Sequence, residues 1–234
     1  MKSVQFSSVA EFEEAAFHLL REHLTLSAAE PHVVMLSGGR TPIGIYRRVA
    51  ESQIPVDRNL RLLLSDERHV PPESPDSNYG QLEPLVRGLD LPASQFVRVH
   101  TELPLDAAAS RYDRALNSLL EPGGRITLGL LGLGADGHTA SLFGDHDLAS
   151  AEHRYAIPIL RPSPPHRVSV TPALFSRIEK LVFLVMGPEK AAIVNEILSH
   201  PERVIAARAV QSCGDVALWY CESPPVLSSE QTDV

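Results

Sequence analysis

Residues 126–141 read ITLGLLGLGADGHTAS, and this stretch decides how the rest of the chain is interpreted. It opens with an apolar run, 126–134, of the kind that forms a buried strand in a parallel sheet. A glycine-rich turn that carries an acid and a histidine follows directly. Two other segments repeat this order of apolar strand and polar turn, HVVMLSGGRTP at 32–42 and RLLLSDERHVPP at 61–72.

Around these three segments the hydrophobic pattern alternates between strands and helices. Strands are predicted at 32–38, 61–66, 126–134, 180–187 and 217–221. Helices are predicted at 9–24, 41–51, 78–86, 106–120 and 188–199. This alternation predicts an α/β fold in which a mostly parallel sheet is covered by helices on both faces. Ligands gather at the carboxyl ends of the strands in such sheets, so we expect the three polar turns to form one site.

The bulk properties limit the class of protein. The 234 residues contain no linker or shift in composition, which predicts a single domain over 1–234. A net charge of −8 argues against a nucleic-acid partner. Two cysteines, Cys213 and Cys221, are too few for a disulfide framework or a four-cysteine zinc site, and we expect them to pack as small apolar residues.

The apolar runs and the two ends of the chain indicate in which cellular compartment the protein is expected. No run reaches the roughly 18 apolar residues that a membrane span needs, so no membrane partner is expected. The first twenty residues, MKSVQFSSVAEFEEAAFHLL, turn acidic after position ten and do not resemble a signal peptide. We therefore expect a cytoplasmic protein, with a disordered tail over 223–234.

The first polar turn, Ser37-Gly38-Gly39-Arg40-Thr41, lies between a predicted strand and a predicted helix. Paired glycines let backbone N–H groups point outward with no Cβ in the way. The start of the next helix adds unpaired N–H groups and the positive end of the helix dipole, which suits a phosphate. An ordinary tight turn is the alternative, and the GK[ST] ending of a Walker loop is absent.

The second polar turn places Asp66, Glu67 and Arg68 at the end of a predicted strand. Two acids beside an arginine can be a solvated turn. At the mouth of a site, Arg68 can instead hold a phosphate or a developing oxyanion, while an acid orients a catalytic partner.

The third polar turn contains Gly132, Gly134 and Gly137, which match the G-x-G-x-x-G spacing of dinucleotide sites. That fingerprint needs an acidic residue at the end of the next strand, about 20 positions on. Glu152 lies at that distance but precedes the next apolar run, YAIPIL, instead of ending it. No nicotinamide or other cofactor is therefore predicted.

His138 is the strongest candidate for chemistry. It follows Gly137 in the turn, and Asp136 two residues earlier can orient its ring. An imidazole has an ordinary pKa of about 6.5 and can accept a proton from water near neutrality. A surface histidine without a role is the alternative. The spacing of His138, His146 and the nearby aspartates fits no zinc signature, so no metal is predicted.

Other parts of the chain narrow the choice of mechanism. A G-x-S-x-G elbow is absent, and neither cysteine lies in an activating context, which disfavours covalent catalysis. Arg167 in RVSVTPALF and Lys190 in GPEK can each add positive charge to an anion site or simply face solvent.

Taken in chain order, LSGGRTPIGIY, LLLSDERHVPPESPDSNYG, LGLLGLGADGHTASLFG, RVSVTPALF, GPEK and VALWY resemble the 6-phosphogluconolactonases of the glucosamine/galactosamine-6-phosphate isomerase superfamily. The match covers nearly the whole chain. DERxVP with a following SN and DGHTASLF are specific, whereas SGGxTP is shared across the superfamily. The resemblance implies a modified Rossmann-like fold, a three-layer α/β/α sandwich with a mostly parallel sheet. It also implies metal-independent hydrolysis of 6-phospho-D-glucono-1,5-lactone to 6-phosphogluconate.

The resemblance also implies roles for individual residues. His138 becomes the base that activates water, with Asp136 and Arg68 as its catalytic companions. The matched motifs place the following residues around the substrate and its phosphate: Ser37, Gly38, Gly39, Arg40, Thr41, Asp66, Glu67, Gly137, Thr139, Arg167 and Lys190. Hydrolysis of a lactone also needs donors for the tetrahedral oxyanion, and Arg68 or backbone N–H groups of 134–138 can supply them.

Two positions depart from the family pattern. Gly144 replaces a proline that is common after SLF, which affects only the stiffness of the loop. Arg40 stands where a small polar residue is more usual, so contact of Arg40 with phosphate and exposure to solvent both stay open.

Two rival functions differ from this reading in identifiable motifs. An aminosugar-6-phosphate deaminase/isomerase typically continues DGH as HIAFNEP and follows DE with Tyr, whereas this chain has HTASLFG and Arg68. A non-catalytic sugar-phosphate sensor usually carries a DNA-binding helix-turn-helix, for which this chain has no room. The expected partner is a phosphorylated sugar lactone, and the expected state is a monomer or weak homodimer.

Overall fold

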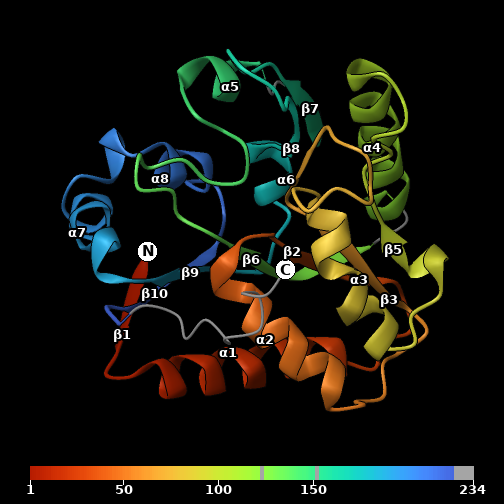
Figure 1. The fold of residues 1–234 in the computed structure, drawn as a ribbon, viewed down its shortest axis with the longest axis horizontal. Helices are drawn as coiled ribbons and strands as arrows, with labels where there is room; N and C mark the ends of the chain where they lie inside the picture. The colour runs from red at the N-terminus through yellow and green to blue at the C-terminus, as the bar shows by residue number, and fades with distance from the viewer. Residues whose placement is uncertain (122–123, 151–152, 224–234) are drawn as a thin grey trace, which may run out of the picture.

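The computed structural model describes residues 1–121, 124–150 and 153–223, and its centre is a parallel seven-stranded sheet (Figure 1). The strand order is β1-β10-β9-β6-β2-β3-β5. The strands are β1 (Lys2–Phe6), β2 (His32–Leu36), β3 (Leu60–Leu64), β5 (Phe96–Val97), β6 (Arg125–Leu131), β9 (Lys180–Met186) and β10 (Asp215–Cys221).

Helices cover both faces of this sheet. One layer consists of α1 (Val9–Leu24), α2 (Arg40–Glu51) and α3 (Asn78–Gly88), and the other of α4 (Leu105–Leu120), α7 (Ala191–Ser199) and α8 (Ile205–Ala209). Shorter pieces are α5 (Asp145–Ala149), α6 (Pro172–Phe175) and the 3-10 turns Ala93–Gln95, Pro188–Lys190 and Pro201–Arg203. The predicted three-layer α/β/α fold with a mostly parallel sheet is confirmed.

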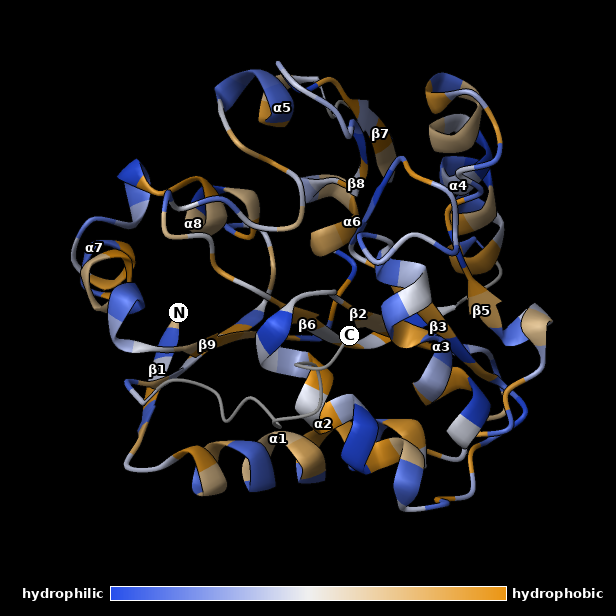
Figure 2. Cartoon of the chain, in the orientation of Figure 1, coloured by the Kyte–Doolittle hydropathy of each residue, from blue (hydrophilic) through white to orange (hydrophobic). Residues whose placement is uncertain are grey.

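The side chains of β2 explain why two helical layers are needed. Val33 and Met35 pack into one hydrophobic core, while Val34 and Leu36 pack into the other. Successive side chains of a strand point to opposite faces, so an uninterrupted apolar strand must be covered on both sides. Figure 2 shows the apolar colour along the central strands and a mixture of polar and apolar colour on the helices.

The strand order creates a crevice beside β2. The chain passes from β2 to β3 and β5 on one side, then returns to β6 on the other side and continues to β9 and β10. Connections that leave β2 and β6 in opposite directions open a crevice at their carboxyl ends, where ligands of open α/β sheets bind. Because β6, β2 and β3 are consecutive in the sheet, the three predicted polar turns start at one edge.

A second, antiparallel sheet corrects one boundary. It consists of β4 (Asp66–Arg68), β8 (Arg167–Val170) and β7 (Ala156–Ile159) in that order from the edge. The strand predicted at 61–66 therefore ends at Leu64, and Asp66 begins a new strand. Ser65 joins the two sheets, since its N–H donates to the Leu36 carbonyl at 2.8 Å and its carbonyl accepts from the Val170 N–H at 2.9 Å.

Other differences are smaller. The strands predicted at 126–134 and 180–187 end at Leu131 and Met186, where glycine begins each turn. The helix predicted at 188–199 starts with a 3-10 turn before α7. The exposed edge strand β1 was not predicted. From residue 224 onward, the predicted tail lies outside the described residues. Within the described ranges, every helix falls short of the length and apolar character needed to cross a membrane.

Two buried histidines lie at the amino-terminal end of the sheet, opposite the polar turns. His32 begins β2 and is 3% exposed, and neither of its ring nitrogens has a hydrogen-bond partner among the described residues. Nδ1 of His23, in the last turn of α1, is also unpaired there. Burial lowers the pKa of both histidines below its ordinary value. Their neutral forms are therefore favoured in the folded protein.

We predict that His32 makes the protein sensitive to acid. Below an ordinary histidine pKa of about 6.5, the unfolded chain binds more protons than the folded chain, so stability falls as the pH falls. His32→Leu should reduce the loss of unfolding free energy between about pH 7.5 and 5.5 by roughly 1–2 kcal/mol. Urea unfolding at each pH measures it. The exposed His200, replaced by Gln, is the control, and equal pH dependence of wild type and His32→Leu would contradict the prediction.

Candidate active site

The loop after β2 packs closely against the start of α3. A Cβ on Gly38 would lie 1.9 Å from Oδ1 of Asn78, so glycine is required there. The Gly39 N–H donates to Oε1 of Gln81 at 3.2 Å, and Gly39 has a φ of 107° that disfavours other residues. A Cβ on Gly39 would meet no atom within 4 Å, so this position borders open space.

The other residues of this loop divide between the interior and the surface. The Ser37 carbonyl is buried and accepts from the hydroxyl of Tyr46 at 3.0 Å. Arg40 is exposed at the first position of α2, and Thr41 is half-buried beside it. The Gly39 backbone thus borders open space, while the charged side chain of Arg40 is exposed at the start of α2.

Glu67 holds β4 against the start of α3. Its carboxylate is 1% exposed and accepts the backbone N–H groups of Asn78 and Tyr79, each at 2.7 Å. It also accepts from the Arg68 N–H at 2.7 Å and the Ser77 hydroxyl at 3.1 Å. Burial raises the pKa of Glu67 above its ordinary value despite these hydrogen bonds, which favour the charged form. The carboxylate of Glu67 thus accepts four hydrogen bonds from described protein donors.

Asp66 connects β4 to the segment that follows His138. Its carboxylate is 8% exposed and accepts from the hydroxyls of Ser65 at 2.9 Å and Ser141 at 2.6 Å. Ser141 is fixed further by its N–H, which donates to Oγ of Ser169 in β8 at 3.1 Å. The second polar turn is therefore joined directly to the segment that follows the third.

Arg68 and Arg167 lie opposite one another in the antiparallel pair of β4 and β8. Nη1 of Arg68 donates to Oδ1 of Asn78 at 2.5 Å and to the Asp76 carbonyl at 3.0 Å. Nη1 of Arg167 donates to the Pro165 carbonyl at 2.6 Å. Burial, followed by the charge of Arg68, lowers the pKa of Arg167. Like charges directly opposite are unfavourable in a sheet, and an anion bound between them would relieve the repulsion.

The turn after β6 presents His138. Nδ1 of His138 lies 2.5 Å from Oδ1 of Asp136, and Nε2 has no hydrogen-bond partner among the residues that the structure describes. Burial raises the pKa of Asp136, but the hydrogen bond and charge of His138 outweigh it, so the pKa lies below its ordinary value. A Cβ on Gly134 would lie 2.1 Å from Nδ1 of His138, and Gly137 has a φ of 85°. Glycine at both positions lets the histidine fold back over the turn.

Neighbouring groups hold this turn and its histidine in place. Thr139 Oγ1 donates to the Gly132 carbonyl at 2.9 Å, and Nζ of Lys190 donates to the Leu133 carbonyl at 2.7 Å. The Phe143 ring packs on the imidazole of His138 with 4.6 Å between ring centroids. The Gly137 carbonyl accepts from the Ala206 N–H of α8 at 2.9 Å.

Several residues that build this region were not predicted from the sequence. Asn78 and Ser77 belong to the SN of a family motif, whereas Gln81, Phe143, Ser169 and Arg161 lie outside the predicted site. Arg161 lies in the proline-rich loop between β7 and β8, and its guanidinium carbon is 3.6 Å from the centroid of Phe143. In the sequence, Arg161 is recognisable only as an arginine at the start of the proline-rich run RPSPP.

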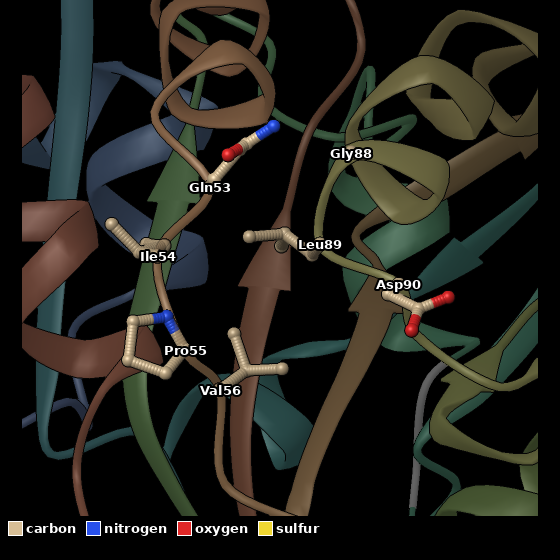
Figure 3. A pocket seen from close by; sticks show the side chains of 7 residues that line it. All are labelled: Gln53, Ile54, Pro55, Val56, Gly88, Leu89 and Asp90. Carbon is tan, nitrogen blue, oxygen red and sulfur yellow. The ribbon is translucent and has the colours of Figure 1, made fainter.

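A pocket of about 450 Å³ lies elsewhere (Figure 3). Residues 53–56 and 88–90 line it, just beyond the carboxyl ends of α2 and α3. A helix of the length of α2 spans roughly 18 Å, so this pocket is at the opposite end of the helix from the Gly39 loop. Among residues 1–121, 124–150 and 153–223, no three His, Cys, Asp or Glu side chains gather as a metal site.

Comparison with known proteins defines the class. Residues 7–219 match the family model described as glucosamine-6-phosphate isomerases/6-phosphogluconolactonase. The chain belongs to this family, as its motifs indicated.

Individual relatives share one name. The 6-phosphogluconolactonase of Thermotoga maritima is 34% identical over 70% of this chain and 74% of its own. The 6-phosphogluconolactonase of Homo sapiens is 31% identical over 93% of this chain and 89% of its own. A crystal structure of 6-phosphogluconolactonase from Thermotoga maritima superposes with a TM-score of 0.79 at 27% identity, covering 94% of this chain and 99% of the other.

We predict that Glu67 is essential to the arrangement of β4 and α3. Glu67→Ala would leave three backbone N–H groups and the Ser77 hydroxyl without their acceptor. Each unpaired buried donor costs about 1–3 kcal/mol, so the free energy of unfolding should fall by about 3 kcal/mol or more. Urea unfolding measures the change, with the exposed Glu73, replaced by Ala, as the control. A loss no larger than that of the control would show that the carboxylate is dispensable.

Proposed function

We propose that this chain hydrolyses 6-phospho-D-glucono-1,5-lactone to 6-phospho-D-gluconate, the second step of the oxidative pentose phosphate pathway. Membership of the family and the shared name of its relatives support this substrate. The observation that carries the proposal is the pairing of Nδ1 of His138 with Asp136, which leaves Nε2 free at the carboxyl edge of β6.

The proposed chemistry uses Nε2 of His138 as the general base. It takes a proton from a water molecule whose oxygen attacks C1 of the lactone, and the carbonyl oxygen becomes an oxyanion. The bond between C1 and the ring oxygen then breaks, and the ring oxygen receives a proton to become the C5 hydroxyl. Asp136 keeps the proton on Nδ1 and stabilises the imidazolium. The N–H groups of Gly134, Gly137 and His138 already donate within the turn, so the oxyanion needs a donor from outside this turn.

The phosphate is proposed to bind between the loop after β2 and the opposed arginines. Gly38 and Thr41 offer backbone donors at the start of α2, and the Gly39 N–H can join them by exchanging Oε1 of Gln81 for a phosphate oxygen. Arg68 and Arg167 offer charge. Arg40 and Lys190 extend the positive field at the rim and beside the histidine turn. Asp66 and Glu67 act as positioning residues, since their described hydrogen bonds go to protein donors. Reaction without a metal ion, a cytoplasmic location and a monomer or weak homodimer stay part of the prediction.

We predict that His138→Ala lowers kcat on freshly generated lactone. Loss of a general base typically costs about 10²–10⁴-fold. His146→Ala, at an exposed histidine of α5, is the matched control and should keep near wild-type turnover. Both are assayed with and without EDTA, and rates are corrected for spontaneous hydrolysis.

Two outcomes of that assay would contradict the proposal. Near wild-type turnover by His138→Ala would exclude His138 as the base, and activity lost in EDTA and restored by a divalent ion would contradict metal independence. A parallel assay offers glucosamine 6-phosphate to the wild type, and release of ammonia without turnover of lactone would favour the deaminase/isomerase function.

We predict that the loop after β2 recognises phosphate specifically. Gly39→Val puts a side chain where the backbone borders open space, and this side chain would block the backbone N–H groups from a phosphate. The variant should therefore lower kcat/KM for the 6-phospho lactone roughly 10–100-fold more than for unphosphorylated gluconolactone. Gly214→Val, at a second glycine with no atom near its Cβ position, is the control. Equal losses on both lactones would leave the loop as an ordinary turn.

A further inference from the structure

Arg161 has a cationic side chain near His138 that makes few contacts with the described residues. It follows β7 in the loop that leads to β8 and is half-buried. Its guanidinium has no hydrogen bond or ion pair with any described residue, and its described contact is the face of Phe143 at 3.6 Å. Five N–H donors are thus held near the site without acceptors from the described protein.

The loop that carries Arg161 is held in place. The Arg161 N–H donates to Nδ1 of His166 at 3.2 Å, and the His166 carbonyl accepts from the His69 N–H at 2.9 Å. The backbone of Phe143 is also anchored, since the Phe143 N–H donates to Oδ2 of Asp147 at 2.7 Å. Both segments that bring Arg161 and Phe143 together are therefore held by backbone hydrogen bonds.

Phe143 relates Arg161 to the proposed chemistry. The same ring contacts the imidazole of His138 at 4.6 Å and the guanidinium of Arg161 at 3.6 Å. Arg161 is also close enough to Arg167 for its charge to lower the pKa of Arg167, after the larger effects of burial, Arg68 and the opposing charge of Asp66. Arg161 is thus near both the histidine turn and the opposed arginines of β4 and β8.

The product of the proposed reaction carries two anions, whereas the substrate carries one. Hydrolysis turns the C1 carbonyl first into an oxyanion and then, after the C1 bond to the ring oxygen breaks and the acid loses its proton, into a carboxylate. The phosphate occupies the other end of the molecule. Arg68 and Arg167 with the Gly39 loop form one anion subsite, and a second is needed next to His138. A guanidinium with free donors matches a carboxylate through two parallel hydrogen bonds.

We propose that Arg161 binds the C1 oxygens, as the oxyanion forms and as the carboxylate of the product. This inference rests on the proposed function and adds a catalytic residue to it. It makes the site selective for a phosphorylated ligand that ends in a carboxylate over the same ligand that ends in an alcohol.

The test compares two ligands that differ only at C1. Isothermal titration calorimetry measures binding of 6-phosphogluconate and of glucitol 6-phosphate to wild type, Arg161→Met and Arg161→Lys. Methionine keeps an apolar stem over Phe143, and lysine keeps the charge without the planar fork. Arg111→Met removes an exposed cation of α4 and controls for net charge.

Arg161→Met should weaken 6-phosphogluconate roughly 10–100-fold and leave glucitol 6-phosphate nearly unchanged. Arg161→Lys should lose less, and Arg111→Met should behave as wild type. In turnover of lactone, Arg161→Met should lower kcat more than it raises KM, because the oxyanion exists only after attack.

Each failure has its own signature. Equal weakening of both ligands by Arg161→Met would mean that Arg161 only supports the fold of the site, and unchanged binding of both would mean that it contacts neither. Either result overturns the inference while wild type still turns over lactone. Wild type that neither hydrolyses lactone nor binds 6-phosphogluconate would overturn the proposed function itself.

Discussion

The buried carboxylate of Glu67 is the constraint on which the candidate site depends. By accepting the N–H groups of Asn78 and Tyr79, it fixes the start of α3 against β4. That contact places Asn78 between Gly38 and Arg68: its Oδ1 accepts from Arg68 at 2.5 Å and leaves no room for a Cβ on Gly38. The glycine of the first turn and the arginine of the second therefore depend on one amide, and a carboxylate at a helix N-terminus holds that amide.

The candidate site is positively charged, although the whole chain carries a negative net charge. The net charge is −8, yet Arg68, Arg161 and Arg167 have no acidic partner among the described residues. The two acids beside them, Asp66 and Glu67, are turned inward and satisfied by protein donors. Burial and mutual repulsion make this cluster unfavourable without a ligand, as the lowered pKa of Arg167 indicates. A bound anion would be stabilised strongly here, because the folded protein already holds these positive charges close together.

The sequence predicted the main sheet and the three polar turns that follow its strands, and the misses have physical causes. Apolar runs such as 32–38 and 126–134 are long enough to identify strands, and their order gave the adjacency of the three turns. The second sheet was missed because β4 has three residues and β8 four, too short for a period to show. Asp66 and Glu67 were expected around the substrate, but only coordinates reveal partners eleven and 75 positions away along the chain. Arg161 depends on the ring of Phe143, a contact that no local pattern encodes.

In the proposed reaction, phosphate binding and chemistry use different segments of the candidate site, and a few short contacts join these segments. Donors suited to a phosphate come from the start of α2 and from β4 and β8, whereas the histidine comes from the turn after β6. The hydrogen bond of 2.6 Å from Ser141 to Asp66 joins these parts, and Ser169 of β8 fixes Ser141 in turn. A lactone is already an activated ester, so a modest base suffices if its distance from the phosphate site is held constant. Buried hydroxyl and carboxylate pairs hold such a distance more rigidly than exposed ion pairs would, because screening and side-chain entropy weaken the latter. The position of the histidine is thus determined as much by β4 as by its own turn.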